Sequence, residues 1–383
     1  MPDRIYLDWN ATTPLRPEAK AAIAAAWEVA GNPSSVHAEG RQARRLVEEA
    51  RAAVAAAVGA RPQDVVFSSG GTEANALALT PGLRRGAGQP VQRLLASAIE
   101  HASVLSGGRF APDAIGSIRV TASGLVDLDH LREQLNGAPA LVSVMLANNE
   151  TGAIQPVAEV ARIVHEAGGL LHVDAIQALG KIPFNIKSIE ADLITLSAHK
   201  IGGLKGVGAV VLAEDVLGLE PLLRGGGQEL GRRAGTENVA GISAFGAAAK
   251  AAMAALEVDA GRLAGLKSSL EDGLKQTPKM IVFSEAAPRL PNTTLFTVPG
   301  LKAETAVIGF DLAGIAVSSG SACSSGKVQP SHVLDAMGQG RELAQGAVRL
   351  SLGWSTSQTE IELALKAWRK LANTLLKGRR NTG

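Results

Sequence analysis

Short runs of consecutive hydrophobic residues recur along the first two thirds of the chain. They lie at 64–68, 93–98, 141–146, 170–174, 193–197 and 208–212. Runs of this length are typical of strands that are buried on both faces, as in parallel sheets. Alanine-rich stretches with helical periodicity lie at 17–30, 41–58 and 157–167. This pattern predicts an α/β fold with a mostly parallel sheet, flanking helices and right-handed crossovers.

The last third of the chain follows a different pattern. Its periodicity predicts a long helix at 256–276 and a final amphipathic helix at about 359–376. Short strands are expected between the two helices, near 281–284, 293–298, 315–318 and 347–352. We therefore expect two domains, a large one over residues 16–255 and a smaller α+β domain formed by residues 1–15 and 256–383.

The composition excludes several classes of protein. The chain has 383 residues, and hydrophobic residues at 46% provide a large core that excludes intrinsic disorder. Lys and Arg (38) nearly balance Asp and Glu (36), and aromatic residues make up 3%, which disfavours nucleic-acid binding. The single cysteine, Cys323, excludes an intrachain disulfide framework and a multi-cysteine zinc site. Neither an apolar signal segment nor an apolar run of about 20 residues is visible, so we expect a cytoplasmic protein without a membrane partner.

Polar residues directly follow five of the predicted strands. They lie at 68–73, at 100–103, at 148–151, at Asp174 with Gln177, and at 197–200. In open α/β sheets, ligands bind beyond the carboxyl ends of the strands. We therefore expect these five clusters to meet at one edge of the sheet and to form a single site.

The residue types in these clusters fit one cofactor, pyridoxal phosphate. The glycine-rich turn before Gly71 suits a phosphate group, because free N–H groups and the helix dipole favour an anion there. Lys200 supplies an amine for the cofactor aldehyde, with Lys205 as its nearest competitor. A carboxylate at Asp174 would pair with the ring nitrogen, and an imidazole at His101 would stack on the ring.

Other interpretations of the same residues stay open. The turn at 68–73 lacks the Gly-Lys-Ser/Thr of a nucleotide-binding loop, and taken alone it is equally an ordinary tight turn. A lone histidine such as His101 is more often structural than catalytic. The histidines available to a metal hydrolase are His37, His101, His165, His172, His199 and His332. These histidines form no HExxH motif or similar close ligand pair. A non-enzymatic binding module would leave the five polar clusters unexplained.

Eleven short motifs occur in an order that resembles one family. They are LDWNATTP, GNPSSVHAEGR, SSGGTEANALAL, EHASV, NNETGAIQP, HVDAIQALGK, SAHKIGGLKGVG, RRAGTENVAG, SSGSACSSG, PSHVLDAMG and VRLSLG. Together they run nearly from end to end and resemble the cysteine desulfurases of the class-V aminotransferase group, of the nitrogen-fixation and iron–sulfur-cluster type. The resemblance implies fold type I of the pyridoxal-phosphate-dependent transferases.

The resemblance also implies roles for individual residues. Those implied to bind the cofactor are Lys200 covalently, Asp174 at the ring nitrogen, Gln177 at the ring hydroxyl, His101 stacked on the ring, Asn149, and Gly71, Thr72, Ser197 and His199 at the phosphate. Thr236 is implied to reach the phosphate from the other subunit of a homodimer. Those implied to bind the substrate carboxylate are Asn149, Arg349 and, as a weaker match, Asn32. A guanidinium suits this task because it binds a carboxylate bidentately.

Cys323 matches the nucleophile of the family and lies in a serine-rich loop at about 318–328. A polar loop exposes a thiol, whereas a lone cysteine is more often a small buried side chain. The resemblance implies that L-cysteine is converted to L-alanine and that its sulfur forms a persulfide on Cys323. The sulfur would then pass to an iron–sulfur scaffold or another acceptor protein. Lys200 would move the α-proton, and His101 or Lys200 would handle protons near the leaving sulfur.

Two other activities use the same fold and cofactor. A class-V aminotransferase needs no thiol, so the GSACSSG segment disfavours it. Selenocysteine lyase activity is closer and stays an alternative. The resemblance implies no stable metal site, with Cys323 as a transient iron–sulfur ligand at most. The sequence does not identify the sulfur acceptor. It also leaves open whether the protein serves nitrogen fixation or general cluster assembly.

Overall fold

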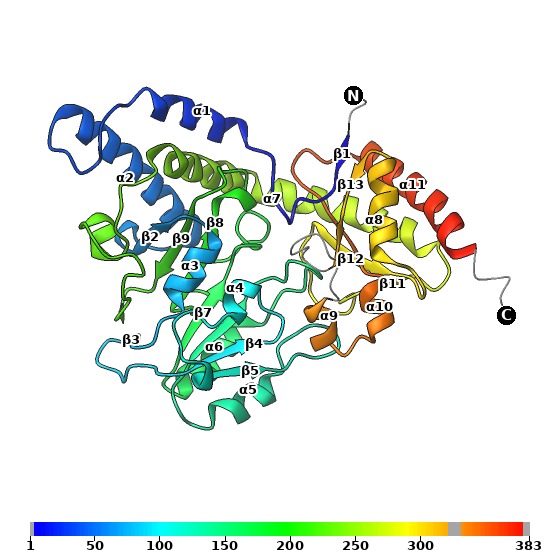
Figure 1. Cartoon of the computed structure of the whole chain (residues 1–383), viewed down its shortest axis with the longest axis horizontal. Helices are drawn as coiled ribbons and strands as arrows, with labels where there is room; N and C mark the ends of the chain where they lie inside the picture. Colours follow the sequence, from blue (N-terminus) through cyan, green and yellow to red (C-terminus); the bar gives the residue numbers. More distant parts are fainter. Residues whose placement is uncertain (1–3, 321–330, 378–383) are drawn as a thin grey trace.

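The computed structural model describes residues 4–320 and 331–377, which form two lobes (Figure 1). The larger lobe is built around a seven-stranded sheet with the strand order β2-β9-β8-β7-β6-β4-β5. These strands are β2 (Val65–Ser68), β4 (Leu94–Ser97), β5 (Ile115–Ile118), β6 (Leu141–Met145), β7 (Leu170–Asp174), β8 (Leu193–Ser197) and β9 (Gly208–Leu212). Neighbours from β5 to β8 pair in parallel, and β9 runs antiparallel to both β8 and β2. The predicted mostly parallel sheet is confirmed.

The six predicted strands match the structure within two residues at each end, whereas β5 was not predicted. Its sequence, IGSI, has a glycine and a serine at its centre, and it lies at the edge of the sheet with only Ile118 fully buried. A half-exposed edge strand needs no continuous apolar run, so the pattern that revealed the buried strands is absent here.

Helices cover both faces of this sheet. They are α1 (Pro17–Trp27), α2 (Ala38–Val58), α3 (Gly71–Ala78), α4 (Ala102–Leu105), α5 (Leu128–Leu135), α6 (Val157–Glu166) and the first part of α7 (Val239–Lys275). On one face α1 and α2 pack against α7, and on the other face α3 packs against β8 and β9. Each face has its own hydrophobic cluster, the first around Phe67 and Phe245 and the second around Leu77 and Val210.

Short elements complete the larger lobe. Strands β3 (Arg84–Arg85) and β10 (Val216–Leu217) form an antiparallel pair. The 3-10 turns are η1 (Pro62–Asp64), η2 (Pro112–Ala114), η3 (Ala198–Lys200) and η4 (Gln228–Gly231).

The smaller lobe combines a four-stranded antiparallel sheet with four helices. The sheet has the order β11 (Ile281–Val282), β12 (Thr293–Thr297), β15 (Val348–Ser351) and β14 (Ser318–Ser319). The helices are α8 (Ala303–Leu312), α9 (His332–Ala336), α10 (Arg341–Gln345) and α11 (Gln358–Lys377). The N-terminal strand β1 (Ile5–Tyr6) pairs in parallel with β13 (Ile315–Ala316), which places the start of the chain in this lobe. Trp368 anchors the core, with its ring 5.0 Å from that of Phe296.

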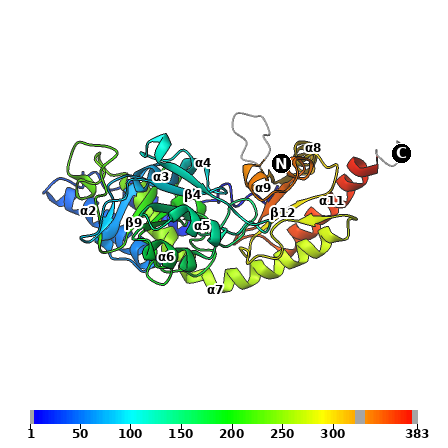
Figure 2. The ribbon, with the colours of Figure 1, turned by 90° about the horizontal axis from the view of Figure 1, so that it is seen from below.

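Helix α7 is longer than predicted. It has 37 residues and runs beneath both lobes (Figure 2), so it passes through the domain boundary expected at residue 255. The side chain of Asn238 caps its first turn by accepting a hydrogen bond from the N–H of Gly241 (3.0 Å). At Gly246 an added Cβ would lie 2.5 Å from Cα of Ala50, so only glycine allows α2 and α7 to approach this closely. The division into domains at residue 255 stays a prediction.

Within the part of the chain that the structure describes, α7 is also the one helix long and apolar enough to cross a membrane by length and composition. Half of the residues in its most apolar stretch are buried inside the protein. Core helices of this kind pass the same test because they too are apolar on several sides.

Candidate functional site

A cavity of about 790 Å³ lies between the two lobes, where the strands of the large sheet end. The predicted site residues that line it are Gly71, Thr72, His101, Asn149, Asp174, Gln177, Ser197, His199, Lys200 and Arg349. The five polar clusters therefore meet at one edge of the sheet, together with Arg349 from the small lobe.

Two predicted site residues, Asn32 and Thr236, do not line this cavity. Asn32 is exposed, and its side-chain oxygen accepts a hydrogen bond from the N–H of Ser34 (2.9 Å). Thr236 lies in a separate pocket with Ser69 and Gly206. Cys323 and most of its loop fall on residues 321–330, outside the described residues.

One end of the cavity is suited to a phosphate group. Helix α3 begins at Gly71, where an added Cβ would clash with Cδ1 of Ile176 at 2.4 Å, so the close packing at this position requires glycine. The hydroxyl oxygen of Ser197 is buried and has no hydrogen-bond partner among the described residues. Burial lowers the pKa of His199 to about 4, so its imidazole is neutral and keeps one N–H donor. The Ser197 hydroxyl and the His199 imidazole therefore lie at the N-terminus of α3, an arrangement that suits an anion.

Lys200 follows β8 through the short turn η3. Its Nζ donates hydrogen bonds to the carbonyl oxygens of Asn10 (2.6 Å) and Ala11 (2.8 Å). Burial lowers the pKa of Lys200 to about 8, with a further contribution from the positive charge of Arg349. Its amine therefore loses a proton more easily than that of an ordinary lysine. Lys205, the competing lysine, is exposed and does not line this cavity.

Asp174 ends β7 and is almost completely buried. Its Oδ1 accepts a hydrogen bond from the N–H of Ile176 (3.0 Å), and its Oδ2 accepts one from the side chain of Asn75 (3.0 Å). Burial raises the pKa of this carboxyl group, whereas the two hydrogen bonds lower it. A cationic partner in the cavity would complete its interactions, since a buried carboxylate requires compensation.

His101 precedes helix α4 and caps it. Its Nδ1 accepts a hydrogen bond from the N–H of Ser103 (3.1 Å) and also lies 2.8 Å from the hydroxyl oxygen of Ser103. Burial lowers the pKa of His101, so the neutral form is favoured. Because Nδ1 is an acceptor, the ring proton lies on Nε2.

Asn10 and Lys181 belong to the site but had no predicted role. The side chain of Gln177 donates to the carbonyl oxygen of Asn10 (2.9 Å). The amine of Lys181 donates to the side-chain oxygens of Gln177 and Asn10. Burial lowers the pKa of Lys181 well below its ordinary value. Both residues lie in motifs used for the family resemblance. The sequence offered one indication of a role for Lys181, namely a lysine four positions after Gln177 within an apolar stretch.

Arg349 enters the cavity from β15. Its Nη2 donates to the carboxylate of Asp8 (2.7 Å), and its Nη1 donates to the carbonyl oxygen of Asn149 (3.0 Å). The Nε atom is buried and has no partner among the described residues. Arg349 therefore lines the cavity with a guanidinium whose hydrogen bonds are not all used, a group suited to a carboxylate.

The match to known families agrees with this geometry. Residues 5–364 match the model of the family described as aminotransferase class-V. The chain belongs to the class-V aminotransferase family. This confirms the resemblance found in the sequence and the expected fold class.

Two curated relatives of this class-V aminotransferase family member are named cysteine desulfurase. The chain is 43% identical over 372 residues to a protein of Cereibacter sphaeroides named cysteine desulfurase, and the match covers 95% of this chain and 94% of the relative. It is 37% identical over 380 residues to a cysteine desulfurase named IscS of Dictyoglomus turgidum, with 98% and 96% of the two chains covered.

Two solved structures resemble this chain over most of its length. A NifS-like protein from Rickettsia africae superimposes with a TM-score of 0.88 at 38% identity and covers 97% of this chain and 100% of the other. A structure described as SspA in complex with cysteine matches with a TM-score of 0.75 at 28% identity over 91% of this chain and 98% of the other.

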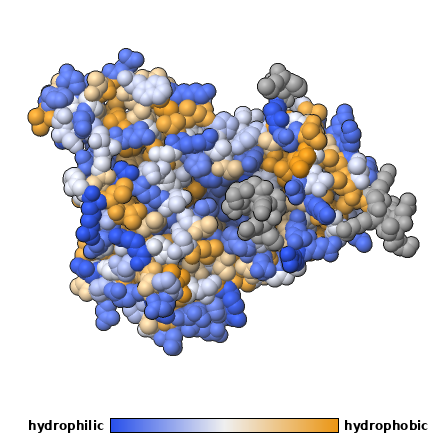
Figure 3. Space-filling view, in the orientation of Figure 1, coloured by the Kyte–Doolittle hydropathy of each residue, from blue (hydrophilic) through white to orange (hydrophobic). Residues whose placement is uncertain are grey.

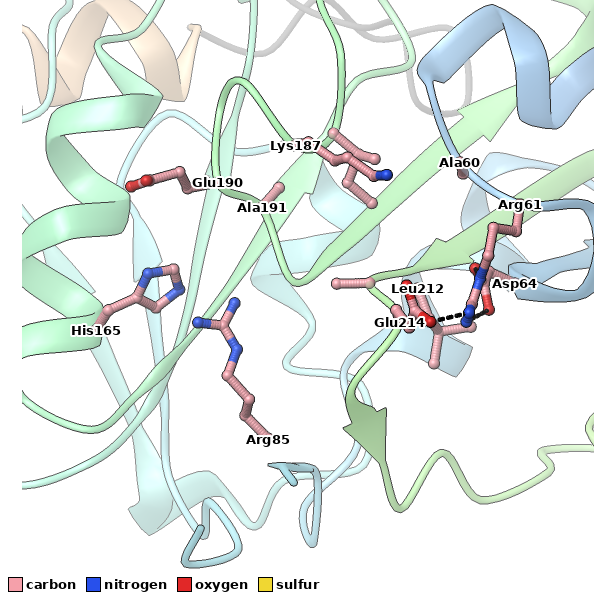
Figure 4. Close-up of a pocket in the computed structure, with 12 residues that line it drawn as sticks. Ala60, Arg61, Asp64, Arg85, His165, Lys187, Glu190, Ala191, Leu212 and Glu214 are labelled. Atoms are coloured by element: carbon pink, nitrogen blue, oxygen red, sulfur yellow. Dashed lines mark hydrogen bonds and ion pairs between the residues drawn. The ribbon is translucent and has the colours of Figure 1, made fainter. Parts of the chain in front are cut away.

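A second cavity in this class-V aminotransferase family member lies near the opposite ends of the sheet strands (Figure 4). Its charged groups are largely occupied by one another. Arg61 pairs with Asp64 (2.8 Å), and both Arg85 (2.5 Å) and His165 (2.8 Å) pair with the buried carboxylate of Asp192. Ion pairs of this kind stabilise a fold and leave few groups for a ligand. Across residues 4–320 and 331–377, no group of three His, Cys, Asp or Glu side chains is placed to hold a metal ion.

Proposed function

We propose that this protein is a pyridoxal-phosphate-dependent cysteine desulfurase that converts L-cysteine to L-alanine and transfers the sulfur to Cys323. One observation carries the proposal: Lys200, Asp174 and Gly71 at the start of α3 line the same cavity as Arg349. The β14 residues that precede the Cys323 segment also line it, which supports delivery of the thiol there. The names of the relatives favour this activity over selenocysteine lyase or aminotransferase activity.

The residues present fit the cofactor. The unpartnered hydroxyl of Ser197 and the start of α3 at Gly71 suit the phosphate group, and Asp174 offers its carboxylate to a protonated ring nitrogen. Bound pyridoxal phosphate supplies an electron sink for the α-carbon of an amino acid. Lys200 would hold the cofactor covalently and then move the α-proton, a task that suits an amine with a pKa of about 8.

Arg349 and Asn149 would orient the substrate. A guanidinium binds a carboxylate through two parallel hydrogen bonds, and Arg349 has one unused buried donor and another held by Asp8. Binding of the L-cysteine carboxylate would therefore compete with the Asp8 carboxylate for this arginine. The competition fixes the substrate carboxylate at the small-lobe side of the cavity.

Sulfur transfer would form one bond and break another. The thiolate of Cys323 attacks the substrate sulfur, and the bond between this sulfur and the β-carbon breaks. The electron pair of that bond goes to the carbon side, which takes up protons and leaves as L-alanine. His101, as a neutral imidazole with its proton on Nε2, lines the cavity and would donate a hydrogen bond there.

Incubation with L-cysteine and a reducing thiol tests the activity. We expect alanine and sulfide in equal amounts, because every transferred sulfur leaves one alanine behind. L-Serine is the matched control substrate, since it has the same size but no sulfur to transfer. Formation of pyruvate without alanine, or amino transfer to a 2-oxo acid without sulfide, would contradict the proposal.

We further propose that the protein acts as a cytoplasmic homodimer and passes the persulfide sulfur to an iron–sulfur scaffold or similar acceptor. The dimer rests on the family resemblance, which implies that Thr236 reaches the phosphate of the other subunit. Within one chain, the pocket of Thr236 shares Ser69 and Gly206 with the hollow beside the phosphate end, so the experiment must distinguish the two subunits.

Thr236→Ala is expected to weaken cofactor binding and to leave the fold intact. In mixed dimers with Lys200→Ala, one of the two sites would then hold both an intact Lys200 and an intact Thr236. Activity per mixed dimer should recover to about half that of the parent, measured on heterodimers separated by two affinity tags. Absence of recovery would show that Thr236 acts within its own subunit.

A further inference from the structure

Asn75 lies on α3 beneath the candidate site, and its side chain is completely buried. Its Nδ2 donates hydrogen bonds to the carboxylate of Asp174 (3.0 Å) and to the hydroxyl oxygen of Ser103 (2.9 Å). Its Oδ1 accepts a hydrogen bond from the hydroxyl of Thr195 (2.6 Å). Both N–H groups and the oxygen of the amide are therefore used.

The orientation of this amide follows from its partners. An ionised carboxylate only accepts hydrogen bonds, so the NH2 group of Asn75 must face Asp174. The oxygen of the amide then faces Thr195, whose hydroxyl must be the donor. A rotation of the amide by half a turn would place its oxygen against the carboxylate oxygen of Asp174, and this repulsion excludes the rotated form.

Further hydrogen bonds favour the same direction of the Thr195 hydroxyl, with its proton toward Asn75. Asp174 and Thr195 are partners in the β7–β8 register, and Ser143 and His172 are partners in the β6–β7 register, so all four side chains share one face of the sheet. The hydroxyl of Ser143 lies 2.8 Å from Nδ1 of His172, and Nε2 of His172 lies 3.1 Å from the hydroxyl of Thr195. With its own proton given to Asn75, Thr195 accepts from Nε2, and His172 is neutral.

Ser103 connects Asn75 to His101 through hydrogen bonds of defined direction. Asn75 donates to the hydroxyl oxygen of Ser103, so the Ser103 proton is directed at Nδ1 of His101, 2.8 Å away. The N–H of Ser103 also donates to this nitrogen (3.1 Å). Two donors on Nδ1 oppose its protonation and keep the imidazole neutral.

We propose that Asn75 is a positioning residue that holds Asp174 as a carboxylate and, through Ser103, holds His101 as a neutral imidazole. The proposal rests on the proposed roles of Asp174 at the ring nitrogen and His101 above the ring. Asp174 and His101 affect each other electrostatically, and a proton shared between them would remove the charge that the ring nitrogen needs. Asn75 donates toward both groups and opposes this transfer.

Other charged and titratable groups face this pair and do not replace Asn75. Lys200 acts on both Asp174 and His101, and His332 acts on His101. Glu100 is buried nearby and interacts with Asp174, and burial raises the pKa of Glu100 to about 8, so it is largely protonated at neutral pH. Of the contacts that the structure gives to Asp174 and Ser103, only the amide of Asn75 bridges the two.

Asn75→Leu tests the proposal, because leucine has the same branched arrangement of heavy atoms as asparagine and no polar atom. In the apoprotein, the pH midpoint of His101 would be followed by NMR with 15N-labelled histidine and assigned with His101→Gln. In the holoenzyme, the shift of pyridoxal phosphate labelled with 15N at the ring nitrogen would report protonation of that nitrogen. We expect the His101 midpoint to rise, the ring nitrogen to lose proton occupancy, and cofactor dissociation to increase about tenfold.

Two further variants separate the effect of Asn75 on His101 from its effect on Asp174. Ser103→Ala removes only the connection to His101, so the His101 midpoint should rise while the ring-nitrogen signal stays at the parental value. Thr195→Val keeps the size of the side chain and releases the amide of Asn75, so both signals should move in the direction of Asn75→Leu by a smaller amount. It also serves if Asn75→Leu does not fold, as judged by circular dichroism.

Parental values of both signals in Asn75→Leu, or in Thr195→Val when the first does not fold, would overturn the proposal. A change in only one of the two signals would overturn the dual role. The His101 titration uses the apoprotein and requires no turnover, so its result is independent of whether the protein acts on L-cysteine.

Discussion

Cys323→Ser should reduce the production of alanine and sulfide from L-cysteine to background. The cofactor activates the α-carbon without a thiol, but removal of the sulfur requires a nucleophile, and Cys323 is the only cysteine in the chain. Serine keeps the size and polarity of the side chain, yet its hydroxyl stays protonated at neutral pH and attacks sulfur poorly. Mass spectrometry of the intact protein should show a sulfur adduct in the parent and none in the variant.

The variant must still bind its cofactor for this result to be informative. Because Lys200 and Asp174 are unchanged, its yellow colour and cofactor content should equal those of the parent, and L-cysteine should still change its absorbance. Turnover near the parental rate would exclude Cys323 as the nucleophile and would favour a lyase or an aminotransferase.

Lys200→Ala should abolish covalent attachment of the cofactor and lower turnover by several orders of magnitude. The amine of Lys200 follows the end of β8 and lines the cavity with Gly71 and Asp174, and alanine offers neither a nucleophile nor a base. Reduction with borohydride followed by peptide mapping measures attachment directly. Lys205→Ala is the matched control, since this lysine is exposed and should leave the mapped peptide unchanged. A reduced cofactor still bound in Lys200→Ala would disprove the assignment.

Attachment to the parental apoprotein should also depend on pH in a defined way. Only a neutral amine attacks an aldehyde, and burial lowers the pKa of Lys200 to about 8. The initial rate of attachment should therefore rise as the pH increases through about 8 and level off above it. An ordinary lysine would continue to gain rate up to about pH 10.

The large sheet was predictable because its central strands are buried on both faces and form continuous apolar runs. Helix α7 was predicted only in its second half, since the alanine-rich residues 239–255 have a weak amphipathic pattern. The apolar surface over α8 was not predicted either (Figure 3). There Ile308 is 53% exposed and Leu312 is 83% exposed, although the helix also lines the cavity.

The sequence likewise predicted the site residues at strand ends but not those held by long-range contacts. Strand ends place Asp174, Lys200 and His101 at one sheet edge, so their convergence follows from topology. Asn10 contacts residues from both lobes, including Thr293, and no local pattern announces such long-range bonds. Asn75 was visible within a glycine-rich motif, but its importance depends on the register of three neighbouring strands, which the sequence does not reveal.

The pairing of Asp8 with Arg349 joins positions 341 residues apart, and Asn10 is held by Ser351 over the same separation. On a ribosome, these contacts cannot form until nearly the whole chain has emerged, whereas the strands that carry Asp174 and Lys200 are synthesised long before. Residues 8–10 therefore reach their final place only after residues 349–351 have been synthesised. The arginine proposed to orient the substrate joins the site later than the lysine proposed to hold the cofactor.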